Sequence, residues 1–309
     1  MSPQSAVPFS FELFPPRPGS AASMPVAIDR LAAVGPDFFS VTFRAGGSTR
    51  AASLELARTV PQRTSVEVMA HLTCVGTTHA EGAEIVREFL DAGVRRFLAI
   101  RGDGDYIGPR DGHLATSAEL VQLIHRVQAE REPSLAPPLT ASGVPRAAVL
   151  RSPHVRVAVA AFLNGHRGSR FQADLDALLA KQAAGADLAL TQLFFHAGDY
   201  ARFVDRARAA GVTIPIVPGI LPVTSIGRLR RAIELSGEDL PADLAIRLEV
   251  EPTVEGQREV GIEHATALAA TVLAAGAPAL HLYTFNQADA ALGVLHRLGL
   301  VPDAAKEPA

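Results

Sequence analysis

Several residue types are scarce in this sequence. Cys74 is its single cysteine, tryptophan is absent, and Lys181 and Lys306 are its only lysines. A single cysteine excludes an intramolecular disulfide and a cysteine-based zinc site, so we expect Cys74 to be a small core residue in a reducing compartment. Neither lysine follows a strand-like segment, which argues against a Schiff-base mechanism.

The chain also lacks an excess of charge of one sign and a long apolar run. Its 29 basic and 32 acidic residues leave a net charge of -3, whereas nucleic-acid and anionic-membrane binders need a cationic excess. No stretch reaches the roughly 18 uninterrupted apolar residues of a membrane span, and Met1–Ser5 does not resemble the start of a signal peptide. We therefore expect a cytoplasmic protein with no nucleic-acid or membrane partner.

What the sequence has in quantity is apolar side chains in a regular order. Hydrophobic residues make up 48% of its 309 residues, enough for a large core. Short apolar runs, typical of buried parallel strands, alternate with longer stretches of helical periodicity. The predicted strands are Phe9–Phe14, Phe38–Phe43, Ser65–His71, Arg96–Arg101, Val155–Ala160, Leu188–Gln192, Ile214–Pro218 and Ala279–Tyr283. Eight strands alternating with helices predict an α/β fold, a single (β/α)8 TIM barrel.

The boundaries of this barrel follow from the segments between the strands. We expect residues 1–309 to form one domain, with 302–309 as a loose tail. Residues 132–151 are rich in proline and alanine and predict a surface loop, while 224–276 has room for two or three helices. Helix ends are predicted at Gly35, Gly93, Gly185, Gly211 and Gly276. A doubly wound open sheet is the alternative, but no Gly-x-Gly-x-x-Gly motif follows the first strand.

Polar residues interrupt the apolar pattern where the predicted strands end. In a (β/α)8 barrel, chemistry collects at these C-terminal ends. The polar residues there are Glu12, Thr42, His71, Asp103, His166, Gln192 and Asn286. Each except Glu12 has an equally simple structural explanation, such as a turn, a helix cap, a satisfied core histidine or a solvated loop.

Glu12 is the polar residue whose position is hardest to explain structurally. It lies between apolar side chains in Phe9-Ser10-Phe11-Glu12-Leu13-Phe14. A carboxylate in such surroundings is costly unless it is paired or protonated. Burial raises the pKa of a carboxyl group toward the range of a general acid. The sequence therefore favours a catalytic role for Glu12.

Several motifs, in order along the chain, resemble those of the methylenetetrahydrofolate reductase family. They are Phe11-Glu12-Leu13-Phe14-Pro15-Pro16, Val41-Thr42-Phe43-Arg44-Ala45-Gly46-Gly47-Ser48-Thr49-Arg50, His71-Leu72-Thr73-Cys74, Arg101-Gly102-Asp103, Gly185-Ala186-Asp187, Thr191-Gln192-Leu193-Phe194-Phe195, Pro218-Gly219-Ile220-Leu221-Pro222 and Tyr283-Thr284-Phe285-Asn286. The resemblance implies a barrel that reduces 5,10-methylenetetrahydrofolate to 5-methyltetrahydrofolate. It also implies that Glu12 is the proton donor and that Asp103 stabilises the cationic intermediate. Substrate-binding residues implied by the motifs are Gln192, which contacts the pterin, and Phe195, Tyr283 and Asn286.

The sequence departs from the family pattern where common bacterial members bind flavin adenine dinucleotide (FAD). On the predicted helix after 170, Asp174 and Lys181 match the family, but Ala177 and Ala180 replace an amide and a guanidinium. Alanine offers neither group to a phosphate. The expected hydride donor is therefore NADH or NADPH acting directly, with FAD doubted. The residues expected to line the cofactor site are Thr42, His71, Arg101, Gly102, His166, Asp174 and Lys181.

Other functions remain as alternatives at this stage. The same reduction could pass through bound FAD, or the chain could be a non-catalytic folate- or nucleotide-binding barrel. A metal-dependent enzyme is not expected, because no pair of strand-end histidines with a carboxylate has the spacing of metal ligands.

Overall fold

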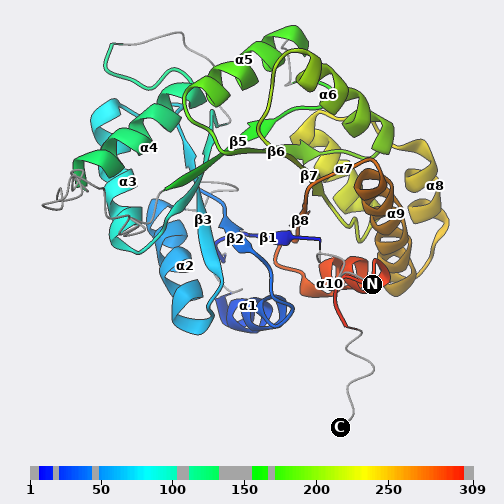
Figure 1. Ribbon diagram of the computed structural model, residues 1–309. Coiled ribbons are helices and arrows are strands. Elements are labelled where there is room, and N and C mark those ends of the chain that lie inside the picture. The colour runs from blue at the N-terminus through cyan, green and yellow to red at the C-terminus, as the bar shows by residue number, and fades with distance from the viewer. Residues whose placement is uncertain are drawn as a thin grey trace, which may run out of the picture.

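The sheet of this protein is a closed barrel of parallel strands, each paired with the next and the last with the first (Figure 1). The computed structural model describes residues 7–16, 21–43, 49–102, 111–131, 155–165 and 171–302. The strands are β1 (Phe9–Leu13), β2 (Phe38–Val41), β3 (Glu67–Thr73), β4 (Arg96–Ile100), β5 (Arg156–Ala161), β6 (Leu188–Leu193), β7 (Ile216–Ile220) and β8 (Leu280–Tyr283). All the predicted strands are present within a few residues of their expected ends, and the predicted TIM barrel is confirmed.

Helices surround the barrel on its outside (Figure 1). They are the short 3-10 turn η1 (Ala21–Ser23) and α1 (Met24–Ala32), α2 (Arg50–Arg63), α3 (His79–Asp91), α4 (Ser117–Arg131), α5 (Phe171–Ala183), α6 (Ala197–Ala209), α7 (Ile226–Ser236), α8 (Ala242–Val250), α9 (Val254–Ala274) and α10 (Ala288–Arg297). The long segment between β7 and β8 holds α7, α8 and α9, as its length predicted. The predicted surface loop at 132–151 and the tail after 302 lie outside the described residues.

Helix ends follow the local signals in the sequence. Every glycine predicted to stop a helix has a positive φ, as at Gly185 (φ 104°) and Gly35 (φ 70°). Glycine, which has no Cβ, is the least strained residue at a positive φ. At the other end of a helix, Thr78 and Glu81 form a reciprocal capping box at the start of α3.

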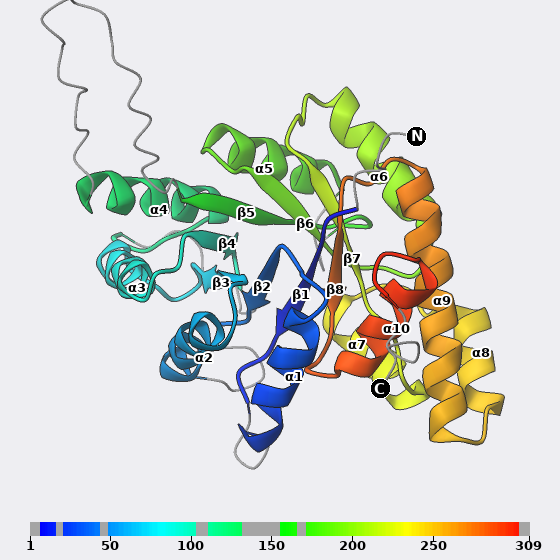
Figure 2. The ribbon, with the colours of Figure 1, turned by 60° about the horizontal axis from the view of Figure 1, so that its bottom comes forward.

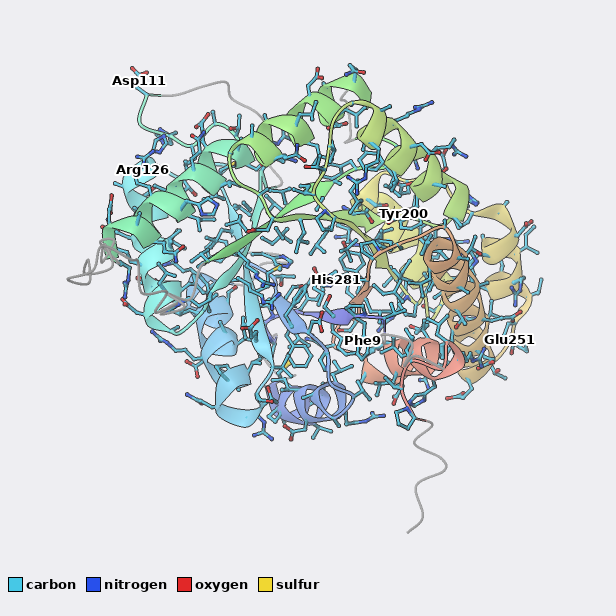
Figure 3. All side chains as sticks on the ribbon, viewed as in Figure 1. Phe9, Asp111, Arg126, Tyr200, Glu251 and His281 are labelled. Carbon is cyan, nitrogen blue, oxygen red and sulfur yellow. The ribbon has the colours of Figure 1, made fainter. Side chains whose placement is uncertain are left out.

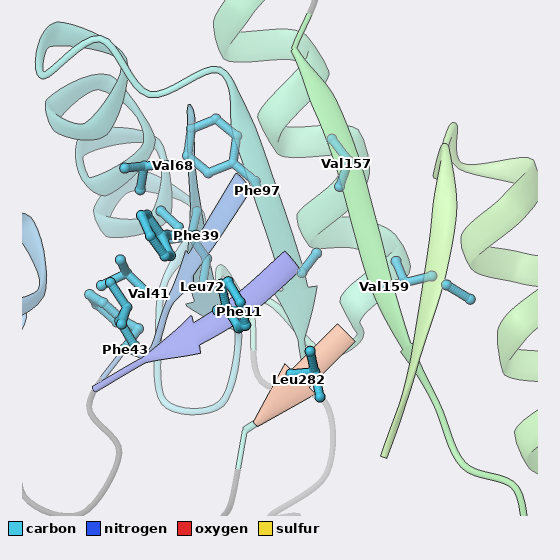
Figure 4. Close-up of a cluster of buried hydrophobic side chains, with 14 of the residues drawn as sticks. Phe11, Phe39, Val41, Phe43, Val68, Leu72, Phe97, Val157, Val159 and Leu282 are labelled. Carbon is cyan, nitrogen blue, oxygen red and sulfur yellow. The ribbon is translucent and has the colours of Figure 1, made fainter. Parts of the chain in front are cut away.

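The strands bury both of their faces. The outward faces pack against the helices through an extensive apolar cluster that includes Phe11, Phe39 and Phe97 (Figure 4). The inward faces form a separate cluster in the barrel interior, made of Phe38, Met69, Leu98, Ala158, Leu190 and Val217. These six inward residues all come from strands, as expected for side chains that fill a barrel. Since side chains alternate along a strand, this cluster identifies which neighbouring residues also point inward.

The first and last strands close the barrel. β1 pairs with β2 on one side and with β8 on the other, and the β1–β8 register runs from Phe9 opposite Leu280 to Glu12 opposite Tyr283 (Figure 2). Residues separated by more than 260 positions therefore lie side by side at the barrel mouth. In the described part of the chain, no helix is long and apolar enough to cross a membrane.

A close approach of α9 to the end of β7 depends on Gly261. A Cβ at this buried position would lie 1.6 Å from the main-chain oxygen of Val223. We expect Gly261→Ala to lower the free energy of unfolding by about 3 kcal/mol, because a main-chain atom cannot move aside cheaply. Urea unfolding measures this, with Gly227→Ala in α7 as the control, since no atom lies within 4 Å of a Cβ there. Equal stability of the two variants would contradict the packing described.

Candidate active site

Inward-facing residues near the C-terminal ends of the strands line the mouth of the barrel. They lie above the interior cluster, on the same side of their strands as its members. The set comprises Glu12, Thr42, His71, Ile100, Gln192, Gly219 and Tyr283. Apart from Ile100 and Gly219, all of them were predicted site residues, so the fold brings together a large part of the site expected from the sequence.

The Glu12 side chain is buried, with 6% of the residue exposed. Its carboxyl group has no hydrogen-bond or ion-pair partner among the described residues. Loss of hydration raises the pKa of Glu12 to about 8, since the charged form is the one that burial disfavours. Glu12 is therefore protonated at neutral pH and directed toward the barrel mouth, as a general acid must be.

Tyr283 borders Glu12 on the neighbouring strand. Its hydroxyl donates a hydrogen bond of 2.8 Å to the main-chain oxygen of Thr191, and burial, together with the nearby Glu12 charge, raises the pKa of Tyr283 well above its ordinary value. The ring occupies space left free by Gly219, where a Cβ would lie 2.5 Å from a Tyr283 ring carbon. Tyr283 is thus held as a neutral, rigid wall beside Glu12.

Two buried polar atoms near the ends of β2 and β3 have no hydrogen-bond partner among the described residues. They are Oγ1 of Thr42 and Nε2 of His71. Burial lowers the pKa of His71 to about 3, so the ring is neutral and can offer a donor or an acceptor according to its tautomer. Because buried polar groups in proteins are nearly always hydrogen-bonded, these orphan atoms fit a site for a polar ligand.

Gln192 supplies a further polar group to the mouth. Its Oε1 accepts a hydrogen bond from the main-chain nitrogen of Leu193 at 3.0 Å, which fixes the orientation of the amide. The amide nitrogen has no partner among the residues that the structure describes, and Gln192 is half-buried. A donor held in this way can bind an acceptor on a flat heterocycle.

Two other predicted residues make contacts within the protein. Phe195 is buried with Leu193, Leu221 and Val223 in a cluster beneath α7 and α8. The side-chain amide of Asn286 is bonded to the main chain of Phe14 on both its oxygen and its nitrogen. The substrate-binding roles of Phe195 and Asn286 stay predictions.

Four further predicted cofactor residues that the structure describes lie just after β4 and on α5. Arg101 and Gly102 are half-buried just after β4, and Asp174 is half-buried on α5. Lys181 is buried and donates to the main-chain oxygen of Ala160 at 2.9 Å. Burial lowers its pKa to about 8, against the opposing effect of Asp174. Lys181 is therefore not a solvated residue of the helix surface.

Two predicted residues, Asp103 and His166, lie outside the described residues. Cys74 is fully buried, and burial raises the pKa of its thiol to about 11, which agrees with the core role predicted for it. Within the described ranges, no group of three or more His, Cys, Asp or Glu side chains is placed to hold a metal ion.

A buried polar group that the sequence analysis missed lies below the mouth. His281 of β8 hydrogen-bonds through Nδ1 to the Ser10 hydroxyl (2.8 Å) and through Nε2 to the Ser40 hydroxyl (3.3 Å). Figure 3 shows His281 near the centre of the ring of strands. Burial lowers its pKa to about 3, so this ring is neutral as well. The signal in the sequence was a histidine between two leucines of a strand, but only the fold brings both serines to it.

The fit of the site to cofactors follows from these contacts. Thr42 and His71 offer unsatisfied polar atoms to a ligand at the mouth. On α5, Ala177 and Ala180 are exposed and have no polar side-chain atom, and the Lys181 ammonium donates one of its three N–H groups to Ala160. Of these three α5 side chains, only that of Lys181 carries a group that could bind a phosphate.

Comparison with known proteins places these residues in a family. The family description "Methylenetetrahydrofolate reductase" matches residues 2–299. The chain is 32% identical over 304 residues to methylenetetrahydrofolate reductase (NADH) 1 of Zea mays, covering 96% of this chain and 49% of the relative. It is 30% identical over 303 residues to 5,10-methylenetetrahydrofolate reductase of Escherichia coli, covering 97% and 93% respectively. The chain therefore spans about half the length of its plant relatives and nearly all of the bacterial one.

Solved structures support the fold. An uncharacterised Clostridium thermocellum protein that binds two copies of 5-methyl-5,6,7,8-tetrahydrofolic acid superimposes with a TM-score of 0.63 at 12% identity, covering 95% of this chain and 96% of the other. At this identity the likeness shows the barrel alone. The match to the family over nearly the whole length, together with the identities to plant and bacterial relatives, shows that this chain belongs to the methylenetetrahydrofolate reductase family.

Proposed function

We propose that this chain reduces 5,10-methylenetetrahydrofolate to 5-methyltetrahydrofolate, with hydride from NADH or NADPH. The observation that carries the proposal is the Glu12 carboxyl group, which is buried at the barrel mouth, unpaired among the described residues and protonated at neutral pH because its pKa is raised to about 8. A non-catalytic binding protein has no need of such a group, whose burial is costly.

The chemistry of this reduction needs a proton before it needs a hydride. Glu12 donates its proton to N10 of the substrate, and the bond between N10 and the bridging carbon breaks with its electron pair remaining on N10. The N5 lone pair then forms an iminium cation with the bridging carbon. Hydride from the nicotinamide adds to that carbon and gives the N5-methyl product. Glu12 then regains a proton from solvent, which balances the reaction.

The electrostatics of the mouth suit a cationic intermediate. The nearby histidines His71 and His281 are neutral because their pKa values are lowered to about 3. They therefore place no positive charge near the iminium, where the repulsion would be strong in a poorly solvated site. The Gln192 amide nitrogen, which has no partner among the described residues, is proposed to bind the pterin. Asp103, which follows β4, is proposed to face the cation, as the family resemblance implies.

The hydride donor is proposed to bind directly at the mouth, without a flavin between it and the substrate. The unsatisfied atoms of Thr42 and His71 support this assignment, as does the lack of polar groups at Ala177 and Ala180 of α5. Arg101, Gly102, His166, Asp174 and Lys181 complete the proposed cofactor site. Both substrates would then occupy the enzyme together, in a ternary complex.

Removal of the proton donor tests the proposed role of Glu12. We expect Glu12→Gln to lower turnover by about 10²–10⁴, the usual contribution of general acid catalysis. In the unmodified protein, turnover should fall as pH rises through about 8, because Glu12 then loses its proton. Oxidation of NADH or NADPH with methylenetetrahydrofolate measures both, and Glu84→Gln, at an exposed carboxylate of α3, is the control. Near-normal turnover of Glu12→Gln would exclude this role.

The same substitution should stabilise the fold. Between the ordinary carboxyl pKa of 4.5 and about 8, the folded protein holds a proton on Glu12 that the unfolded chain releases, so the free energy of unfolding falls as pH rises through this window. At pH 7 this cost is roughly 3 kcal/mol, from about 1.4 kcal/mol per pH unit. Urea unfolding at pH 5 and pH 7 measures this. The free energy of unfolding of Glu12→Gln should rise relative to that of the unmodified protein between pH 5 and pH 7, whereas that of the control Glu84→Gln should not.

The flavin question has a direct test in the purified protein. We expect the absorbance spectrum to show far less than one flavin per protein chain, and added FAD not to stimulate the reaction. Two-substrate kinetics should give intersecting lines, since both substrates must bind before hydride transfer. A yellow protein with stoichiometric flavin and parallel-line kinetics would show that the reaction passes through FAD. Absence of any NADH or NADPH oxidation would favour a non-catalytic folate- or nucleotide-binding barrel.

A further inference from the structure

The pairing between β1 and β8 continues past the end of the strands, but through side chains. The main-chain register ends with Glu12 opposite Tyr283. Beyond it, the Thr284 hydroxyl donates to the main-chain oxygen of Glu12 at 2.6 Å. The amide of Asn286 then accepts from the main-chain nitrogen of Phe14 at 2.9 Å and donates to its main-chain oxygen at 2.8 Å. The Asn286 amide thus takes the place of a peptide group in a strand.

This arrangement needs an unusual turn. Phe285 and Asn286 both have a positive φ, 45° and 61°, which non-glycine residues rarely adopt, and which persists only where the surroundings enforce it. The main-chain nitrogen of Asn286 donates to the Thr284 hydroxyl at 3.0 Å. The ring of Phe285 stacks on that of Phe14, with centroids 5.2 Å apart and planes within 11°. Both residues of the turn therefore contact Phe14.

Among the described residues, the hydrogen bonds to the main chain of Phe14 come from the Asn286 amide. The two residues after Phe14, Pro15 and Pro16, have no N–H group and cannot donate a hydrogen bond to a neighbouring strand. On the β2 side, the last hydrogen bond within the described residues is from the main-chain nitrogen of Thr42 to the main-chain oxygen of Leu13. The end of β1 beyond Leu13 is therefore anchored through the Asn286 amide and the Phe285 ring. Glu12 is two residues from this anchor, on the same inward face.

We propose that Asn286 is a positioning residue, which holds the Glu12 carboxyl in its buried place at the barrel mouth by binding the main chain of Phe14. This inference rests on the proposed function of Glu12 as proton donor. It assigns the Asn286 amide to the protein's own main chain instead of to the folate. Thr284 supports the same segment from the Glu12 carbonyl.

The test removes the amide without disturbing the turn. Asn286→Gly keeps a residue that adopts a positive φ without strain and deletes only the side chain. We expect turnover to fall about 10- to 100-fold, the usual effect of a misplaced catalytic group, while KM for methylenetetrahydrofolate changes less than about threefold. Gln287→Ala, at the adjacent exposed residue, is the control and should leave turnover unchanged.

The pH dependence distinguishes positioning from a general loss of structure. In Asn286→Gly the fall of turnover with pH should begin below pH 8, because a carboxyl group that moves toward solvent regains a lower pKa. The infrared band of the protonated carboxyl, identified by its loss in Glu12→Gln, should titrate at the same lower pH. Asn286→Asp keeps the acceptor for the Phe14 nitrogen, so it should retain more activity than Asn286→Gly.

Combining substitutions tests whether Asn286 acts through Glu12. In a Glu12→Gln background, Asn286→Gly should cause no further loss of turnover, because the group that it positions is already gone. An unchanged infrared titration and pH profile, together with a raised KM, would overturn the proposal in favour of direct substrate binding. Full additivity of the two losses would overturn it as well. If Asn286→Gly shows no cooperative unfolding transition, and so is not folded, the same measurements are made on Asn286→Asp.

Failure of the proposed function has a different signature. If Glu12→Gln alone were fully active, Glu12 would not be the proton donor. The infrared titration of the Glu12 carboxyl in Asn286→Gly would still report whether Asn286 holds that group in place.

Discussion

The pairing of β1 with β8 is the interaction on which the rest of this structure depends. It closes the barrel, and by doing so it removes Glu12 from water. Loss of hydration is what raises the pKa of Glu12 to about 8. The same contact that completes the fold thus creates the protonated carboxyl group at its mouth. Stability is lost in the process, since the folded protein must keep a proton that the unfolded chain would release at neutral pH.

Three described side chains buried at or just below the barrel mouth are polar but uncharged. Glu12 is protonated, and burial keeps His71 and His281 neutral. Polar atoms without charge can bind a heterocycle by hydrogen bonds and place no positive charge near a cation formed on it. The unsatisfied atoms of Thr42 and His71 belong to this arrangement, because a ligand at the mouth would complete their hydrogen bonding. Family membership and local chemistry therefore point to the same kind of reaction.

The sequence drew attention to residues at the barrel mouth, such as Glu12, but not to the contacts that hold them in place. Glu12 stood out because a carboxyl group in an apolar strand needs an explanation that local structure does not offer. The support given by Thr284 and Asn286 was not visible, because it depends on a contact between residues about 270 positions apart. The pattern Tyr283-Thr284-Phe285-Asn286 predicted that this segment matters, but it did not show that the Asn286 amide binds main chain.

By itself, the sequence determined the order of strands and helices, the closed barrel and the identity of the acidic residue at its mouth, because periodicity, glycine stops and an isolated polar residue are local properties. Only the tertiary structure decided the protonation of Glu12, the neutrality of His71 and the burial of Lys181 against Ala160. Hydration and hydrogen bonding of a side chain depend on which distant strands and helices surround it. Those neighbours exist only once the barrel is closed.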